Sequence, residues 1–182
     1  MRKNIFGIIF FCFHILYIRN TFAVLSADKE IIMLKKYKPY IVEILLALAV
    51  GGLSAFLTKD AMADFETLTK PPLSPPGFLF PIVWTVLFVL MGISAGMVYK
   101  KSGSVPFIYR LSLIVNFLWS IIFFNMGAYL FAFFWLLLLL VLIIMTVADY
   151  IKVSKTAAYL QIPYLLWVIF AGYLNFGIWF LN

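Results

Sequence analysis

Apolar residues run along this chain in five long stretches, separated by segments that carry charged residues, proline or glycine. Each stretch has about the 20 residues that a helix needs to cross the hydrocarbon core of a bilayer. The pattern predicts an all-α integral membrane protein, a bundle of five transmembrane helices. We expect these helices over residues 39–58, 78–99, 106–124, 129–151 and 156–181.

Composition favours the same class. Hydrophobic residues make up 65% of the chain and charged residues 12%, whereas a soluble domain carries about a quarter charged residues. The net charge of +7 comes from basic residues that lie singly or in short clusters at the ends of apolar stretches. Such placement indicates membrane topology and not the binding of nucleic acid.

Metal and disulfide chemistry find little support in the sequence. The single cysteine, Cys12, excludes an intrachain disulfide. With the single histidine, His14, it makes at most two ligands, and a metal site needs three or four. We therefore expect no metal centre and no required cofactor.

Basic residues lie mostly on one side of the predicted bundle. The opposite side has only Lys59 and Lys70, beside three carboxylates. Positive charge collects on the cytoplasmic side, so we expect the start of the first helix to be cytoplasmic and the C-terminus outside, in a bacterial cell membrane. The eight residues on the basic side are Lys35, Lys36, Lys38, Lys100, Lys101, Arg110, Lys152 and Lys155.

Residues 1–33 precede the five stretches and are treated as an N-terminal extension to a membrane domain of residues 34–182. Arg2 and Lys3 lead into an apolar run, residues 5–18, that is short for a spanning helix and close to the length of a signal-peptide core. Three interpretations stay open: a membrane-associated segment that is not cleaved, a signal peptide, or an upstream extension with translation starting at Met33.

A proline-rich segment, residues 69–77, lies in the long polar loop between the first two helices. It holds four of the eight prolines. Because proline fixes φ and lacks a backbone donor, we predict a stiff, non-helical loop. The whole loop, residues 59–77, is longer than most loops of compact domains, and long loops are often functional.

Two polar residues inside the helices are candidates for function. Glu43 lies one turn into the first helix, where we expect it to reach the interface or to pair with Lys36 or Lys38. Asn116 shares a helix face with Trp119, and either an interhelical hydrogen bond or a ligand contact would satisfy it.

Glycine and proline predict how two of the helices pack. Gly92 and Gly96 form a GxxxG pattern, which is typical of close helix packing within a bundle or between subunits. Pro163 is expected to kink the last helix and to free a carbonyl near Tyr159.

Aromatic residues are the remaining candidates for binding. Trp84, Trp119 and Trp167 fall well inside the helices, whereas Trp179 and Trp135 fit a belt at the membrane interface. A cleft of indole and phenyl rings with few polar groups suits a large, flat, apolar ligand.

Three motifs now identify a resemblance. Over about residues 39–182 the chain resembles the tryptophan-rich sensory protein / translocator protein family (TspO/MBR), also called peripheral-type benzodiazepine receptors. The matching segments are Leu68-Thr69-Lys70-Pro71 with Pro75-Pro76 and Trp84; Asn116-Phe117-Leu118-Trp119-Ser120 with Phe123-Phe124; and Ile162-Pro163-Tyr164-Leu165-Leu166-Trp167 with Phe170-Ala171-Gly172-Tyr173-Leu174-Asn175.

The resemblance implies a five-helix bundle, often dimeric, that binds porphyrins and in some members sterols and synthetic drugs. It implies a pocket beneath the loop between helices one and two, with Lys70, Pro71, Pro75 and Pro76 as a lid. Trp84 and Trp167 match the tryptophans linked in some bacterial members to light-dependent breakdown of protoporphyrin IX. The implied ligand-binding residues are Trp84, Phe88, Asn116, Trp119, Phe123, Pro163, Trp167 and Ala171.

The chain also departs from the family pattern. Asp64-Phe65 stand where the family often has Trp-Tyr, and Leu73 stands where it often has Trp. We therefore expect the lid to have lost aromatic contacts. No basic residue follows Tyr173, so the weak sterol-recognition pattern is absent.

The leading functional hypothesis is a membrane receptor or sensor that binds a tetrapyrrole, a porphyrin or haem, as a homodimer in the lipid bilayer. The alternative is an enzyme that degrades porphyrin with light and oxygen, in which Trp84 and Trp167 would be catalytic. Transport of a tetrapyrrole or sterol ranks below both, since the sequence shows no broken-helix pair or internal repeat. A packing scaffold without a ligand ranks last.

Overall fold

The computed structural model describes residue 33 and residues 35–182. The N-terminal extension, with Cys12 and His14, lies outside the described residues. The chain divides into two units, Met1–Lys38 and Pro39–Asn182. The account below concerns the second unit, which contains the five-helix domain.

The predicted architecture is confirmed. Five helices are long and apolar enough to cross a membrane, and the described part of the chain has no strand. Their bounds are Lys35–Thr58, Leu79–Ser102 (α3), Phe107–Asn125 (α4 and the π-helix η1), Tyr129–Val153 (α5) and Lys155–Leu181 (α6 and α7).

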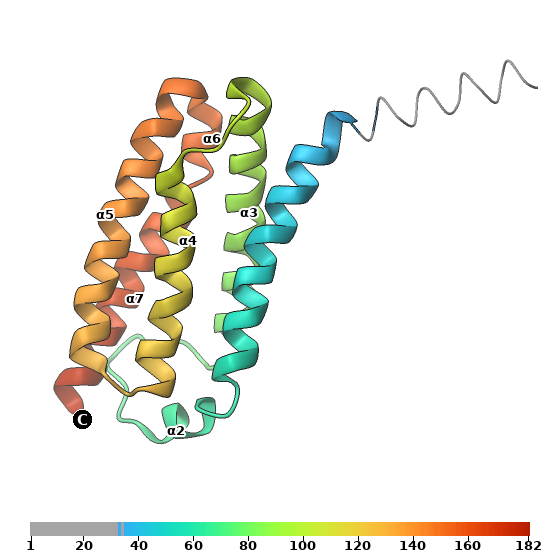
Figure 1. Cartoon of the computed structure of the whole chain (residues 1–182). Helices are drawn as coiled ribbons and strands as arrows, with labels where there is room; N and C mark the ends of the chain where they lie inside the picture. Colours follow the sequence, from blue (N-terminus) through green and yellow to red (C-terminus); the bar gives the residue numbers. More distant parts are fainter. Residues whose placement is uncertain (1–32, 34) are drawn as a thin grey trace, which may run out of the picture. The chain divides into compact units, whose positions relative to one another are not determined.

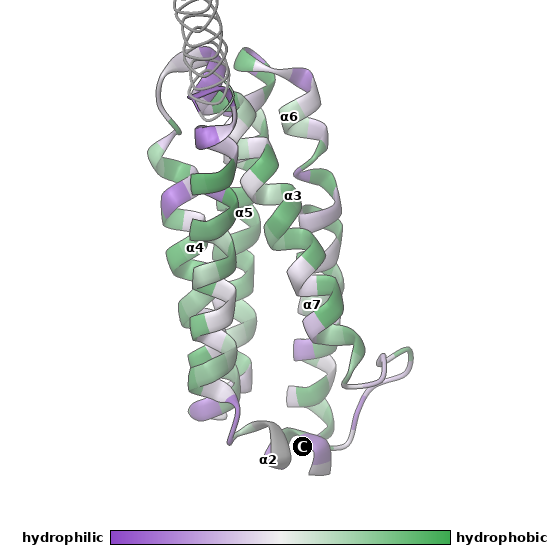
Figure 2. Ribbon diagram, turned by 90° about the vertical axis from the view of Figure 1, so that its right-hand side faces the viewer, coloured by the Kyte–Doolittle hydropathy of each residue, from purple (hydrophilic) through white to green (hydrophobic). Residues whose placement is uncertain are grey.

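The helices stand side by side, with α6 at one end of the bundle and a short loop helix, α2 (Met62–Thr67), at the other (Figure 1). The C-terminus lies at the α2 end. Hydrophobic residues cover the middle of the helices and hydrophilic residues gather toward both ends, as expected for a bundle that crosses a bilayer (Figure 2).

The GxxxG pattern of α3 packs inside the bundle. A Cβ atom at Gly92 would collide with the backbone of Ile44 on the first helix, and one at Gly96 would lie 2.8 Å from the Cα atom of Tyr40. These two glycines therefore let the first helix and α3 cross with their backbones close together. The alternative that the sequence left open, a subunit contact through the same glycines, does not fit this packing.

The last membrane span is interrupted near its start. It consists of α6 (Lys155–Tyr159), a turn at residues 160–161, and α7 (Ile162–Leu181), with Pro163 in the first turn of α7. Proline is tolerated in a first turn because the amide it lacks has no intrahelical partner there. The predicted span over 156–181 is confirmed, and the structure divides it into two helices just before Pro163.

A buried polar cluster supports the break. The Ser94 hydroxyl on α3 donates to the Ala157 carbonyl at 2.7 Å, and the Gln161 amide donates to the Ser94 hydroxyl at 3.2 Å. Ser94 and Gln161 are both fully buried. The cluster ties the break to the neighbouring span, so polar groups at the break are satisfied without water.

Glu43 has a different partner from the one expected. It pairs with Arg110 near the start of α4 (Phe107–Ser120), and not with Lys36 or Lys38. The sequence offered lysines nearby along the chain, whereas the fold brings an arginine from a distant segment.

The long loop is tied to the C-terminal end of α7. The Asn182 side chain exchanges two hydrogen bonds with the backbone of Thr69, at 2.9 and 3.0 Å. The Tyr173 hydroxyl donates to the Pro72 carbonyl at 2.8 Å. A Cβ atom at Gly177 would lie 2.6 Å from the Pro71 ring, so glycine lets the proline lie directly on the helix.

Candidate functional site

A cavity of about 350 Å³ is lined by several of the predicted site residues. It lies between the first helix, α3 and α4, and we call it the main cavity. Its volume falls in the range of small-molecule sites, about 300–1,000 Å³.

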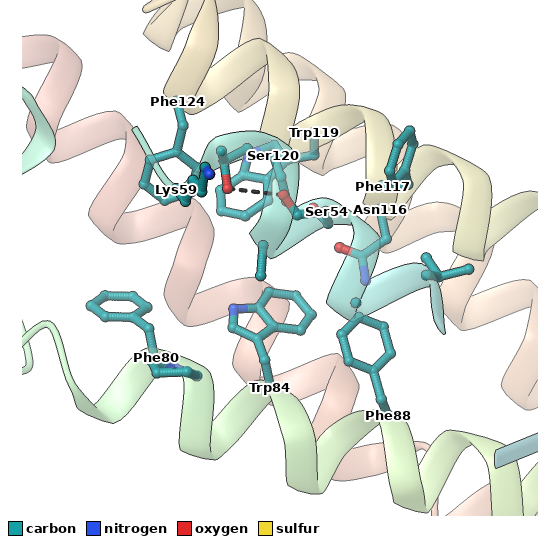
Figure 3. A pocket seen from close by; sticks show the side chains of 15 residues that line it. Ser54, Lys59, Phe80, Trp84, Phe88, Asn116, Phe117, Trp119, Ser120 and Phe124 are labelled. Atoms are coloured by element: carbon teal, nitrogen blue, oxygen red, sulfur yellow. Dashed lines mark hydrogen bonds between the residues drawn. The ribbon is translucent and has the colours of Figure 1, made fainter. Parts of the chain in front are cut away.

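The wall from α3 is aromatic. Phe80, Trp84 and Phe88 stand on successive turns and point toward the first helix and α4 (Figure 3). Their spacing of four residues places them on one face of the helix. Trp84 stacks on Phe88 with ring centroids 5.6 Å apart.

A second indole lies next to the first in the lining of the cavity. The Trp84 and Trp119 rings have centroids 6.3 Å apart. Trp119 is held in place because its indole N–H donates to the side-chain oxygen (Oδ1) of Asn175 on α7 at 3.2 Å. The Asn175 amide donates in turn to the Tyr129 carbonyl at 2.7 Å, which fixes the orientation of both side chains.

One buried polar group at the main cavity has no partner. Asn116 is only 3% exposed, and its side-chain nitrogen makes no hydrogen bond with the described residues. An unpaired buried amide is destabilising by about 1–3 kcal/mol. The sequence left two roles open for Asn116, an interhelical hydrogen bond and a ligand contact. Its nitrogen makes no interhelical hydrogen bond with the described residues, and the side chain lines the main cavity.

The first helix contributes small and hydroxyl side chains to the main cavity. Gly51, Ser54, Ala55 and Thr58 line it. The Thr58 hydroxyl donates to the Ser54 carbonyl at 3.0 Å. Small residues on this wall leave room for a ligand that the rings of α3 and α4 would contact.

The end of α4 departs from α-helical geometry beside the cavity. Residues Ile121–Asn125 form a π-helix, η1, which is a feature often found at functional sites. Asn125 at its end donates from its side chain to the Leu57 carbonyl of the first helix at 2.9 Å. This bond joins two of the three walls at the loop side of the cavity.

A second, small cavity of about 30 Å³ lies beneath the loop. Phe65 of α2, which is 7% exposed, lines it and packs against the rings of Phe80, Phe123 and Phe124. The loop has therefore kept one aromatic contact with the bundle, and the expectation that it lost such contacts is wrong at Phe65. Leu73, in contrast, is 82% exposed and packs on nothing in the bundle.

The structure distributes the predicted residues over several places. Trp84, Phe88, Asn116 and Trp119 line the main cavity. Lys70, Pro75, Phe123 and Ala171 line the small cavity, together with Trp119.

The other predicted residues line neither cavity. Pro71 rests on Gly177, and the Pro76 carbonyl accepts the amide of Leu79 at the start of α3. Pro163 is exposed in the first turn of α7. Trp167 contacts Phe80 edge-on, at 6.1 Å between ring centroids, and its buried indole nitrogen lacks a hydrogen-bond partner among the described residues.

Sequence reasoning missed several residues of the main cavity. Phe80 lies four residues before Trp84, and Ser54 and Thr58 share a helix face with the small residues Ala47, Gly51 and Ala55. Helical spacing from residues already chosen could have found them. Lys59 also lines the main cavity, but helical spacing does not predict it, because it follows the last residue of its helix.

The fold and the cavity define an all-helical integral membrane protein with an aromatic, small-molecule-sized site between its helices. Comparison with known proteins agrees, since the model of the TspO/MBR family matches residues 43–180. The chain belongs to the TspO/MBR family.

Relatives come from all three domains of life. The chain is 42% identical to tryptophan-rich protein TspO of Chlorobaculum tepidum, over 75% of this chain and 91% of the relative. It is 33% identical to the protein of the same name from Archaeoglobus fulgidus, over 78% and 95%. It is also 33% identical to the translocator protein of Bos taurus, over 71% and 81%.

Proposed function

We propose that this protein is a membrane receptor or sensor that binds a tetrapyrrole, a porphyrin or haem, in the main cavity. The observation that carries the proposal is a cavity of about 350 Å³ whose lining bears two neighbouring indoles and a buried amide nitrogen that has no partner among the described residues. Flat π-systems stack favourably on indole and phenyl rings, and a ligand acceptor would satisfy Asn116. The porphyrin is a ligand in this proposal, and no further cofactor is needed.

The test is a titration of the protein in nanodiscs with protoporphyrin IX, in which binding is measured by tryptophan fluorescence. We expect saturable quenching. Trp84→Phe should weaken binding by about two- to tenfold, the range of a lost aromatic contact. Trp179→Phe is the matched control, because Trp179 lies near the C-terminus and does not line the main cavity. Equal dissociation constants for the wild type and Trp84→Phe would contradict the proposed site.

A second function, photo-oxidation of the bound porphyrin, is favoured by one observation. Trp84 and Trp119 both line the main cavity, so two oxidisable indoles would lie beside an excited ligand. Trp167 lines neither cavity, so in this second function Trp119 takes the place that the resemblance gave to Trp167. Illumination of the complex with and without oxygen tests it, and porphyrin loss no faster than in empty nanodiscs would exclude it.

The proposed orientation places the α2 end of the bundle outside a bacterial cell membrane. The Lys101 side chain donates to the Ser154 hydroxyl at 3.2 Å, so the basic ends of α3 and α5 lie together. Arg110 and Glu43 bring the start of α4 and of the first helix to the same end. Labelling of single cysteines placed at residues 72 and 103 from either side of the membrane would test this orientation.

We also propose that the protein forms a homodimer, as the resemblance implies, through a surface other than the GxxxG face of α3. Gly92 and Gly96 are used against the first helix, so the dimer interface would have to form elsewhere. Cross-linking in nanodiscs at increasing lipid-to-protein ratio is the direct measurement.

A further inference from the structure

The main cavity is chemically uneven along its length. Among its lining residues, Lys59, Phe80 and Phe124 lie nearest the loop, whereas Phe88 and Asn116 lie deeper along α3 and α4 and mark its inner end. Asn116 and Phe124 are eight positions apart, which corresponds to about 12 Å of α-helix. Figure 3 shows Lys59 beside Phe124, away from Asn116.

Lys59 brings a positive charge to a lining that otherwise contains no charged residue. No carboxylate lines the main cavity, and the ion pairs found among the described residues belong to other cations. The Lys59 ammonium lies 5.0 Å from the centroid of the Phe56 ring. Its charge is therefore not neutralised by a partner within the described bundle.

Lys70, the other lysine on this side, is engaged differently. Its ammonium pairs with Glu66 at 3.2 Å and lies 4.8 Å from the centroid of the Phe65 ring. It lines the small cavity and not the main one. A negative group on a ligand in the main cavity would therefore meet Lys59 first.

The remaining wall is apolar. Trp84, Phe88 and Trp119 present rings, whereas Lys59 is exposed at the end of its helix, where water partly screens its charge. A charged group at one end, with apolar rings along the middle, selects a ligand that is itself charged at one end.

We propose that Lys59 is the anion-binding group of the main cavity, so that its ligand is an amphipathic acid. The ligand carries a carboxylate at the loop-side end and a flat apolar body along Trp84 and Trp119. This inference rests on the proposed function and adds to it the charge and the orientation of the ligand.

Two sources could supply the negative group: the acid of a free ligand, or the phosphate of a lipid headgroup. The experiment separates them with two ligands and two membranes. Protoporphyrin IX carries two carboxylates, and its dimethyl ester has the same ring system without the charge. Nanodiscs of phosphatidylcholine alone offer no net-negative lipid, whereas nanodiscs that also contain phosphatidylglycerol do.

Three variants complete the design. Lys59→Met keeps the apolar stem and removes the charge, and Lys59→Arg keeps the charge. Lys155→Met is the matched control, because Lys155 is exposed at the α6 end of the bundle and makes the same change in net charge. Thermal unfolding of each variant shows that the fold is kept.

In phosphatidylcholine we expect Lys59→Met to bind protoporphyrin IX about two- to fivefold more weakly than the wild type, the range of a partly exposed charge pair. Binding of the dimethyl ester should not change, and Lys59→Arg and Lys155→Met should behave as the wild type. Added salt should weaken binding of the acid and not of the ester.

Two results would overturn the inference while leaving tetrapyrrole binding intact. One is equal binding of the acid by the wild type and Lys59→Met. The other is an equal loss for acid and ester. If phosphatidylglycerol competes with the acid only when Lys59 is present, the lysine binds anions from both sources. If neither compound quenches the wild type, the proposed function itself is wrong.

Discussion

Arg110 on α4 donates two hydrogen bonds to the Glu43 carboxylate on the first helix, at 2.5 and 2.6 Å. The two partners differ in exposure. The Glu43 side chain is 4% exposed and the Arg110 side chain 32%. Glu43 therefore depends on this one cation, whereas Arg110 could still direct its charge toward the interface if the carboxylate were lost.

This asymmetry predicts unequal effects of the two single substitutions. Arg110→Met leaves a carboxylate buried without a partner and should lower the free energy of unfolding by about 3 kcal/mol. Glu43→Gln should lower it by only about 1 kcal/mol, because the remaining charge is partly solvated. Chemical denaturation in detergent measures both. The control is Lys152→Met, which breaks an exposed pair with Asp149 and should change stability by about 0.5 kcal/mol or less.

The double variant Glu43→Gln with Arg110→Met sharpens the test. It buries no charge, so it should be more stable than Arg110→Met alone. A double variant that lost as much stability as the sum of the single ones would contradict the ion-pair account.

The crossing of the first helix and α3 predicts a strict size limit at Gly92. Gly92→Ala would place a methyl group against the backbone of Ile44, which cannot move aside as a side chain can. We expect a loss of about 1–3 kcal/mol, the range for overpacking a core. Gly52→Ala on the first helix is the control, since a Cβ atom there meets nothing within 4 Å. Equal melting temperatures for the two variants would argue against the close crossing.

Asn116 predicts opposite effects on stability and binding. Asn116→Leu removes an unpaired buried amide and should raise the free energy of unfolding by about 1 kcal/mol. It also removes the donor at the inner end of the main cavity, so porphyrin affinity should fall by about three- to tenfold. The two are measured by denaturation and by the quenching titration. A variant that is less stable and binds normally would assign the amide a structural role.

The tie between Asn182 and Thr69 predicts local mobility. Asn182→Ala removes both hydrogen bonds between the side chain and the loop, so the amides of residues 68–74 should exchange faster with deuterium. Because Asn182 is exposed and lies at the chain end, the melting temperature should change little. Amides of the turn at residues 103–105, at the opposite end, serve as the internal reference. Unchanged exchange in 68–74 would show that Tyr173 and Gly177 hold the loop without Asn182.

Helix number and approximate bounds follow from the apolar stretches alone, because crossing a bilayer needs a length that few other structures share. The partner of Glu43 could not be found in this way. Arg110 lies 67 positions further along the chain, and the two meet because the first helix and α4 run parallel, with their starts at the same end of the bundle. Pro163 was recognised as a disruption, but whether it bends a helix or begins a new one depends on the Gln161–Ser94 contact.

The candidate site was predictable only in part, because the sequence names residues but does not show which of them share a cavity. Trp84, Phe88, Asn116 and Trp119 were named from the sequence and line one cavity. That Phe123 and Ala171 line a different one depends on where Phe65 of the loop packs. The π-helix adds to this, because it changes which faces of residues 121–125 meet the bundle.

The rings of Phe80, Trp119 and Phe124 line both cavities. Side chains change rotamer far more easily than helices change position. These three rings therefore form a wall that the two cavities share, and their rotation would change the shape of both while the backbone stays in place. Whether a long ligand can extend from the first helix toward α7 then depends on side-chain torsion angles and not on an opening of the bundle.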